Sequence, residues 1–521
     1  MINKWSGTKG WTFAALALTL ILVLSACSSS NGGDPSNEGA PSSSASASAS
    51  GVSQTVTVAI NGDIQNFNPY TNQSVDFFTI RYNVFDTLVK YDSSMKIEAN
   101  LATEWKQDSD TQWTFTLSDG IVFHNGDTLT AEDVKYSIDS ALNPDRASFF
   151  ASDLKNISSV EGEGNQVVIK LSKPDPVLLS TFANFPIVPN NSFDALSSNP
   201  IGTGPFQFVS WEAGDKIVLQ KNPDYWKGDT TNIDTLVVRP ITDAAVRLSN
   251  LISGTIDVVA TLDPNQLLHV NAREDYIILE PESSNKTVLA EVVLNNNEAF
   301  KNPKVMQALV RALDKNDIKK NVYQGYGNII WSPFPSNDFG YKEGTAYPFD
   351  IEESKKLLAE AGYDNGISFT LILPTGFSDL EQIAVIWQAG LKKAGVDMKI
   401  EKMELNSWVD KYVARDYEMT LNIYPQSGND ASIYANLIMI PLFEKSLPDP
   451  SEALALIEDA SSTTDEAKRL ELYAKLQDLV SEQAPIIPIQ EVPIAAGVSN
   501  KITGLEIYPT SYVYFGNAQV N

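Results

Sequence analysis

The single cysteine of this chain, Cys27, is the feature that most constrains how the chain can fold. No internal disulfide can form, so the folded part of the 521 residues must be held together by a hydrophobic core and hydrogen bonds. Hydrophobic residues make up 43% of the chain and charged residues 20%, which is ordinary for a globular protein. A chain of this length can build a large core and usually divides into two or three domains.

The residues before Cys27 have the order of an export signal. Two lysines precede an apolar run over residues 11–24, and Leu24-Ser25-Ala26 directly precede Cys27. The run is too short for a comfortable membrane-spanning helix, and its flanks are typical of a secretory signal. The four residues ending at Cys27 resemble a bacterial lipobox, whose cysteine follows the cleavage site and carries a diacylglycerol. We therefore expect a signal peptide over residues 1–26 and a lipid anchor at Cys27; the alternative is a plain secretory signal beside an incidental buried cysteine.

A serine-rich segment follows the expected anchor. Residues 28–50 contain ten serines, with Gly, Ala, Asn and Pro filling much of the rest. Such a segment buries too little apolar surface to offset the entropy of ordering it, so we expect a flexible tether over residues 27–52. No second apolar run long enough to span a membrane follows Cys27. The expected location is the extracytoplasmic face of a cell membrane, on a Gram-positive-type surface or in a periplasm.

The charge and the motifs of the chain disfavour several functions. A formal net charge of −27 repels nucleic acid and anionic lipid. Two histidines, His124 and His269, are too few for a histidine-rich metal cage, and we expect neither a metal nor a cofactor. The nucleophile-elbow, zinc-protease, C-x-x-C, P-loop and dinucleotide-binding motifs do not occur. We expect no enzyme, and we interpret His124 as a hydrogen-bonded structural residue. The alternatives are a general base at His124 and a pair of catalytic carboxylates for glycoside hydrolysis, although nothing in the sequence singles out a pair.

Strand and helix patterns alternate along the chain. Thr130, Asn302 and Asp350 each precede an apolar face at helical spacing, which predicts three helix starts, and residues 380–394 predict a further helix. This order of elements is typical of an α/β protein. The segments predicted to be strands are 55–60, 113–117, 167–171, 369–373 and 398–403.

A series of motifs runs through the chain from about Thr55 onwards. They are Leu101-Ala-Thr-Glu-Trp105, the run from Trp113 to Val134, Gly202-Thr-Gly-Pro-Phe206, Lys221-Asn-Pro-Asp-Tyr-Trp226, Gly254-Thr-Ile-Asp257, the blocks 302–309 and 312–314, the run from Asp350 to Gly362, and Pro485-Ile-Ile-Pro488. In this order they closely resemble the motifs of extracellular solute-binding proteins of the dipeptide, oligopeptide and nickel importer family.

The resemblance implies a two-lobed, periplasmic-binding-protein-like (type II) clam with an extra inserted domain. One lobe would combine residues 53–97, 200–295 and 490–521 with an inserted domain over 98–199, and the other lobe would span 296–489. Solute would bind between the lobes, which close by a hinge motion. The expected partners are a small solute and an ABC permease in the membrane, and the protein is expected to be a monomer.

Candidate ligand-binding residues come from the same resemblance. Many peptide-binding relatives carry a pattern like G-W-x-x-D-x-x-D-P, whose first Asp pairs with the peptide's α-ammonium. Aligned here, Tyr424 takes the aromatic place, Ser427 the place of the first Asp and Asp430 that of the second. A neutral hydroxyl cannot supply a charge-assisted bond, so either Asp430 or another acid pairs with the ammonium, or the solute has none there. The alternative is an alignment shifted by a few residues; Asn72, in the loop 71–74, is a further candidate.

We therefore expect a protein that captures peptides or a related solute for import. Ser427 and the aromatic Tyr424 also favour a neutral oligosaccharide, and a metal chelate is a further alternative. Two different classes remain open: a surface hydrolase and a receptor for a peptide signal.

Overall fold

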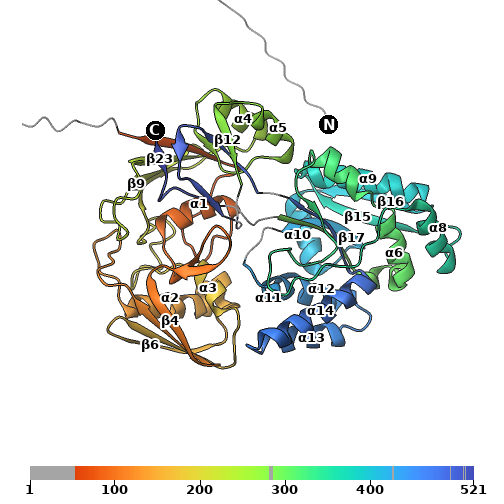
Figure 1. Cartoon of the computed structure of the whole chain (residues 1–521), viewed down its shortest axis with the longest axis horizontal. Helices are drawn as coiled ribbons and strands as arrows, with labels where there is room; N and C mark the ends of the chain where they lie inside the picture. Colours follow the sequence, from red (N-terminus) through yellow and green to blue (C-terminus); the bar gives the residue numbers. More distant parts are fainter. Residues whose placement is uncertain (1–52, 281–285, 425–427, 493, 509, 511) are drawn as a thin grey trace, which may run out of the picture. The chain divides into compact units, whose positions relative to one another are not determined.

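A computed structural model describes residues 53–280, 286–424, 428–492, 494–508, 510 and 512–521. The expected signal peptide, the anchor at Cys27 and the tether lie outside the described residues, as does Ser427. Three main β-sheets organise the described part of the chain (Figure 1).

The first lobe, which we define as residues 53–280 and 494–521, contains a seven-stranded sheet. Its order is β12-β19-β11-β1-β10-β9-β8. Strand β1 pairs in parallel with β10 and β11, and the other pairs are antiparallel. The strand bounds are β1 Thr55–Ile60, β8 Phe206–Glu212, β9 Lys216–Lys221, β10 Thr235–Pro240, β11 Val258–Val259, β12 Tyr276–Leu279 and β19 Ala496–Ser499.

An antiparallel four-stranded sheet belongs to the same lobe. Its order is β4-β5-β7-β6, and helix α2 (Ala131–Leu142) packs on β6 and β7. The strands are β4 Ala102–Ser109, β5 Gln112–Leu117, β6 Ile157–Glu163 and β7 Gln166–Leu171. The other helices of the first lobe are α1 Val75–Val84, α3 Leu178–Asn184, α4 Ala244–Ile252 and α5 Leu267–Asn271. Short pairs complete the lobe: β2 (Val89–Tyr91) with β3 (Ile97–Ala99), β20 (Ile502–Thr503) with β23 (Gln519–Val520), and β21 (Glu506–Tyr508) with β22 (Tyr512–Tyr514).

The second lobe, residues 286–492, contains a mixed six-stranded sheet of order β14-β18-β13-β17-β15-β16. Helix α9 packs on β15 and β16 and α14 packs on β18 (Figure 1). The strands are β13 Lys286–Val292, β14 Asn328–Ile329, β15 Ser368–Pro374, β16 Asp397–Met403, β17 Met419–Tyr424 and β18 Ile486–Val492. The helices are α6 Pro303–Arg311, α7 Lys315–Asp317, α8 Ile351–Glu360, α9 Ser378–Lys393, α10 Leu405–Ala414, α11 Ala431–Tyr434, α12 Ile440–Ser446, α13 Ser451–Ser461 and α14 Glu466–Gln483.

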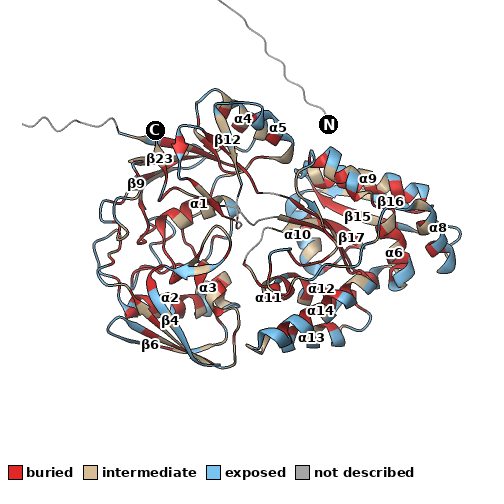
Figure 2. Cartoon of the chain, in the orientation of Figure 1, coloured by how far each residue is buried: buried red, intermediate tan, exposed pale blue. Residues whose placement is uncertain are grey.

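Each lobe has its own large hydrophobic core. The core of the second lobe runs from Val288 to Val492 and includes the fully buried Trp387, whose indole N–H donates to the Leu309 carbonyl (2.9 Å). In the first lobe, one core joins the seven-stranded and four-stranded sheets, and a smaller one lies beneath α4 and α5. Figure 2 shows buried residues along the strands and exposed residues on outer helices such as α8 and α13. Each lobe therefore buries a hydrophobic core of its own, as separate domains do.

The predicted local elements are confirmed. All five predicted strands are present, as β1, β5, β7, β15 and β16. Thr130 and Asp133 form a capping box at the start of α2, and Asn302 and Asp350 cap α6 and α8. A cap satisfies backbone N–H groups that have no partner inside the helix, which explains why these helix starts can be read from sequence.

Two predicted lobe boundaries need correction. The ranges 200–295 and 490–521 were both expected in the first lobe. The first range contains strand β13, and the second contains the end of strand β18. Both strands pair in the sheet of the second lobe, because β13 exchanges backbone hydrogen bonds with β17 and β18. The first-lobe sheet therefore contains β12, which ends at Leu279, and β19, which begins at Ala496, whereas β13 from Lys286 and β18 up to Val492 belong to the second-lobe sheet. The rest of the predicted division stays a prediction. In the described part of the chain, every helix is too short or too polar to cross a membrane.

Candidate functional site

The loop after β17 makes contacts between the two lobes. The Asn429 side chain accepts a hydrogen bond from Ser180 Oγ (3.2 Å) and donates one to the Met95 carbonyl (2.9 Å). Further along, Lys173 forms an ion pair with Glu458 (3.0 Å). Asn429, next to the predicted ligand residue Asp430, therefore lies where the second lobe meets the first.

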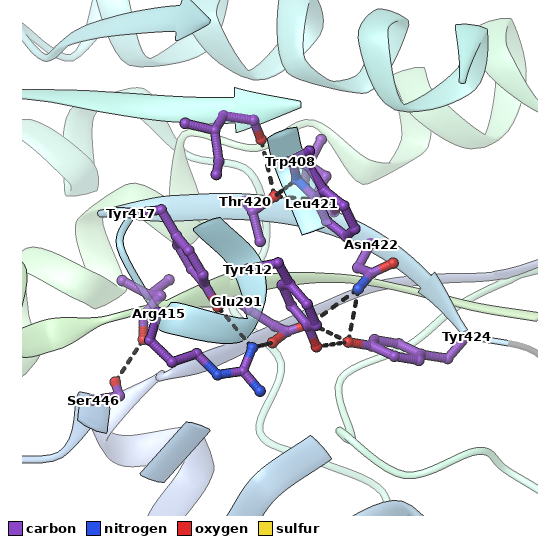
Figure 3. Close-up of polar contacts among 12 residues, drawn as sticks. Glu291, Trp408, Tyr412, Arg415, Tyr417, Thr420, Leu421, Asn422, Tyr424 and Ser446 are labelled. Atoms are coloured by element: carbon purple, nitrogen blue, oxygen red, sulfur yellow. Dashed lines mark hydrogen bonds and ion pairs between the residues drawn. The ribbon is translucent and has the colours of Figure 1, made fainter. Parts of the chain in front are cut away.

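Tyr424 is the last residue of β17, and its hydroxyl points into the second lobe (Figure 3). The hydroxyl contacts Glu291 and the Tyr412 hydroxyl, and it accepts a hydrogen bond from Asn422 Nδ2 (2.8 Å). A phenol has one donor and two acceptor positions, so these three partners fill them. Burial and the neighbouring Glu291 raise the pKa of Tyr424 well above its ordinary value, which keeps the phenol neutral. The hydroxyl of Tyr424 is therefore engaged within the second lobe, and its ring packs edge-on against Tyr434.

Glu291, in the middle of β13, is the centre of this group and was missed by the sequence reasoning. Its side chain is 0% exposed, and it accepts from the Tyr412 hydroxyl (3.2 Å) and faces Arg415 Nη1 (3.4 Å). Burial raises the pKa of Glu291, and the bond from Tyr424 and the charge of Arg415 oppose that rise. One signal could have found it, because Glu291 is a single charge within the apolar run 288–294. A charge in such a strand must be paired inside the protein.

Asp430 follows the same loop and caps α11. Its Oδ1 accepts from the Ser432 backbone N–H (3.0 Å) and pairs with Arg469 Nη2 (2.6 Å). Both partners are nearly buried, at 9% and 5% side-chain exposure. The negative charge of Asp430 is therefore matched within the second lobe.

Asn72 holds the loop that leads into α1. Its amide N–H donates to the Asn66 carbonyl (2.6 Å), and its carbonyl oxygen accepts from the Ser74 backbone N–H (2.9 Å). The structure thus brings Tyr424 and Asp430 to one loop and places Asn72 in the other lobe. Whether these residues contact solute stays a prediction.

An aromatic group in the first lobe was also missed. The Tyr82 ring stacks on Tyr512 (3.8 Å between centroids), which stacks on Tyr508 (4.5 Å). Phe78 lies one helical turn before Tyr82, and both are half-buried on α1. The spacing of Phe78 and Tyr82 is a helical i,i+4 pair, which sequence reasoning could have singled out.

His124 has the structural role predicted for it. Its ring contacts the Gly204 carbonyl through Nε2 (3.0 Å) and accepts from the Gly202 N–H through Nδ1 (3.3 Å). Burial lowers the pKa of His124, so the ring is held neutral between these two backbone groups. Within the described ranges, no group of three or more His, Cys, Asp and Glu side chains is arranged to hold a metal ion.

Two lobes, each built on its own sheet and core and meeting through polar side chains, form the architecture of a solute-binding protein. The family model for bacterial extracellular solute-binding proteins, family 5, matches residues 96–440, and the chain belongs to this family. The chain is 29% identical over 486 residues to heme-binding protein A of Haemophilus influenzae, covering 84% of this chain and 87% of that one. It is 28% identical over 477 residues to the probable D,D-dipeptide-binding periplasmic protein DdpA of Escherichia coli, covering 86% and 90%.

Solved structures share the fold. The substrate-binding protein CtaP of Listeria monocytogenes superposes with a TM-score of 0.82 at 24% identity, over 90% of this chain and 99% of that one. The periplasmic binding protein DppA of Helicobacter pylori, in complex with the peptide STSA, gives 0.74 at 24% identity, over 89% and 98%. These likenesses confirm the two-lobed type II fold.

Proposed function

We propose that this chain is the extracytoplasmic substrate-binding lipoprotein of an ABC importer and that it captures peptides or a related small solute. Two described residues support the proposal: Tyr424 is the aromatic residue that ends β17, and Asn429 hydrogen-bonds Ser180 and Met95 of the other lobe. Ligand would enter between open lobes, the lobes would close over it, and the closed form would dock on the permease. The solute would leave chemically unchanged, which separates this proposal from a surface hydrolase.

Peptides are the first ligand class to test, because relatives named for dipeptide and peptide binding share the family and the fold. We expect di- to pentapeptides to raise the melting temperature of the purified protein. Ligand at a hundredfold excess over Kd adds about 2.7 kcal/mol to the free energy of unfolding, which is readily measured. If peptides leave the melting temperature unchanged while an oligosaccharide raises it, the peptide proposal is wrong.

The ammonium of the peptide has its own test. Ser427 is neutral and Asp430 is already paired with Arg469, so neither offers an unpaired negative charge to the ligand. Peptides that bind should therefore tolerate N-acetylation with less than a tenfold loss of affinity, measured by calorimetry on matched free and acetylated peptides. A loss of a hundredfold or more would mean that another carboxylate pairs with the α-ammonium.

A neutral oligosaccharide is the second candidate. The hydroxyl of Tyr424 is occupied, and its ring could stack on a sugar face as readily as on a peptide side chain. Mass spectrometry of the natively purified protein would distinguish the two classes by the mass of the ligand that it carries.

The lipid anchor at Cys27 is part of the proposal. Cys27→Ser should release the protein from the membrane fraction into the medium or the periplasm, while ligand binding stays unchanged. A Cys27→Ser protein that still fractionates with membranes would contradict the anchor.

A further inference from the structure

We infer that Glu291 is a positioning residue for ligand binding, which acts by fixing the ring of Tyr424 at the end of β17. The inference rests on the proposed function, because it takes Tyr424 to contact the solute. It goes beyond that function by assigning a role in affinity to a side chain that is itself fully buried and cannot touch the solute.

The contacts around Glu291 give the geometric reason. Glu291 lies on the central strand β13, and Tyr424 lies on its neighbour β17, with Glu291 paired to Thr420 in the register. The side chains of Tyr424, Tyr412, Asn422 and Arg415 all converge on its carboxylate (Figure 3). Three of these four partners come from β17 or from α10, which precedes it, so one carboxylate ties the end of β17 to the adjacent strand.

The chemistry of the group requires a carboxylate. All four partners donate to Glu291, and a carboxylate can accept about four hydrogen bonds without donating any. Glutamine has nearly the same shape, but its NH2 group is a hydrogen-bond donor. It would face the donors of the neighbouring side chains at a position where the carboxylate presents an acceptor oxygen. Arg415 also stacks on Tyr412, with its guanidinium carbon 4.3 Å from the ring centroid, so loss of the carboxylate would disturb the Tyr412 that touches Tyr424.

The alternative is that Glu291 only stabilises the second lobe. A double-mutant cycle separates the two roles, because Tyr424→Phe removes the one hydroxyl that links the ring to Glu291. We would measure the Kd of the tripeptide Ala-Phe-Ala for the natural protein, Glu291→Gln, Tyr424→Phe and the double variant at pH 7. Glu444→Gln, an exposed glutamate in the same lobe, is the matched control.

We expect Glu291→Gln and Tyr424→Phe each to weaken binding about tenfold, and the double variant to be no weaker than Tyr424→Phe alone. The Glu444→Gln control should bind as the natural protein does. An unchanged Kd in Glu291→Gln, or losses that multiply in the double variant, would overturn the inference.

A second readout is the pH profile of Kd. The charged and titratable groups that face Glu291 are Arg415, Tyr412, Tyr417, Tyr424 and Tyr434. The phenols stay neutral below pH 9, so Glu291 is the member of the group that titrates as the pH falls towards 4.5. Binding by the natural protein should weaken over that range more than binding by Glu291→Gln; equal profiles would overturn the inference.

The same double-mutant cycle, measured on the free energy of unfolding without ligand, keeps this inference separate from the proposed function. Urea unfolding of the four proteins should show that Glu291→Gln and Tyr424→Phe are coupled in the free protein. If the natural protein does not bind Ala-Phe-Ala, the proposed peptide ligand fails for this probe. Strictly additive effects on unfolding then overturn the inference. If the effects are coupled, the Kd cycle with a ligand that the natively purified protein carries decides between a role in affinity and a role in stability alone.

Discussion

At the scale of single residues, two buried carboxylates of the second lobe, Glu291 and Asp430, are paired within that lobe. Asp430 pairs with Arg469, and Glu291 faces Arg415. Pairs like these are costly to break, because removing one partner leaves the other as an uncompensated buried charge. Ligand selectivity near this loop should therefore depend on shape and on aromatic contact more than on charge.

Asp430→Asn tests the strength of the pair with Arg469. An asparagine can still cap α11, so the substitution isolates the loss of charge. We expect the free energy of unfolding to fall by about 3 kcal/mol, measured by urea denaturation. Asp449→Asn is the control, because Asp449 is exposed and accepts from the Ser451 hydroxyl and backbone N–H at the start of α13, and it should leave the stability nearly unchanged. Equal stability of the two variants would mean that the Arg469 pair contributes little.

Glu291 makes a prediction about pH. Burial raises its folded-state pKa above the ordinary value of 4.5, so its contribution to stability is fully present below that value and is lost as pH rises through the folded pKa. Relative to Glu291→Gln, the natural protein should therefore lose stability as the pH increases from 4.5 towards 8. Unfolding free energies at unit pH intervals would check this, and a difference that is constant with pH would contradict it.

At the scale of elements, the sequence correctly predicted features set by neighbouring residues, such as helix caps, but not contacts between residues far apart in the chain. The caps at Thr130, Asn302 and Asp350 lie within a few residues of the helices that they start, so sequence alone reveals them. Tyr82 stacks on Tyr512, more than 400 residues away on β22, and Glu291 contacts Tyr424, which lies 133 residues away along the chain. Such pairings come from the folded topology, which one sequence without its relatives does not encode in readable form.

The crossing of residues 202–204 over the end of α1 gives an element-scale prediction. A Cβ on Gly202 would lie 2.1 Å from the Val84 carbonyl oxygen. Gly202→Ala should therefore lower the melting temperature sharply or prevent folding. Gly228→Ala is the comparison, since its φ of +84° is unfavourable for alanine but nothing lies near its Cβ, and it should cost about 1 kcal/mol. Similar costs for the two variants would show that the backbone relaxes away from Gly202.

At the scale of the whole molecule, Asn429 provides two of the hydrogen bonds between the lobes. Its removal should shift the population towards the open form and so weaken the apparent affinity for ligand, because closure then releases less free energy.

Asn429→Ala should thus raise Kd several-fold and increase the radius of gyration of the liganded protein in solution scattering. Lys173→Ala removes an exposed ion pair between the same lobes and should change both quantities little. If Lys173→Ala has the larger effect, Asn429 is not the main contact that closes the lobes.

The placement of β19 has a consequence for how the chain is made. This strand comes from residues 496–499, yet it lies between β11 and β12 inside the sheet that begins with β1. A polypeptide that emerges from a translocation channel amino end first cannot complete that sheet until nearly all of it has passed through. Until β19 is available, the edges of β11 and β12 that pair with it stay exposed. Such an order suits a chain whose first lobe folds only when nearly the whole polypeptide is available.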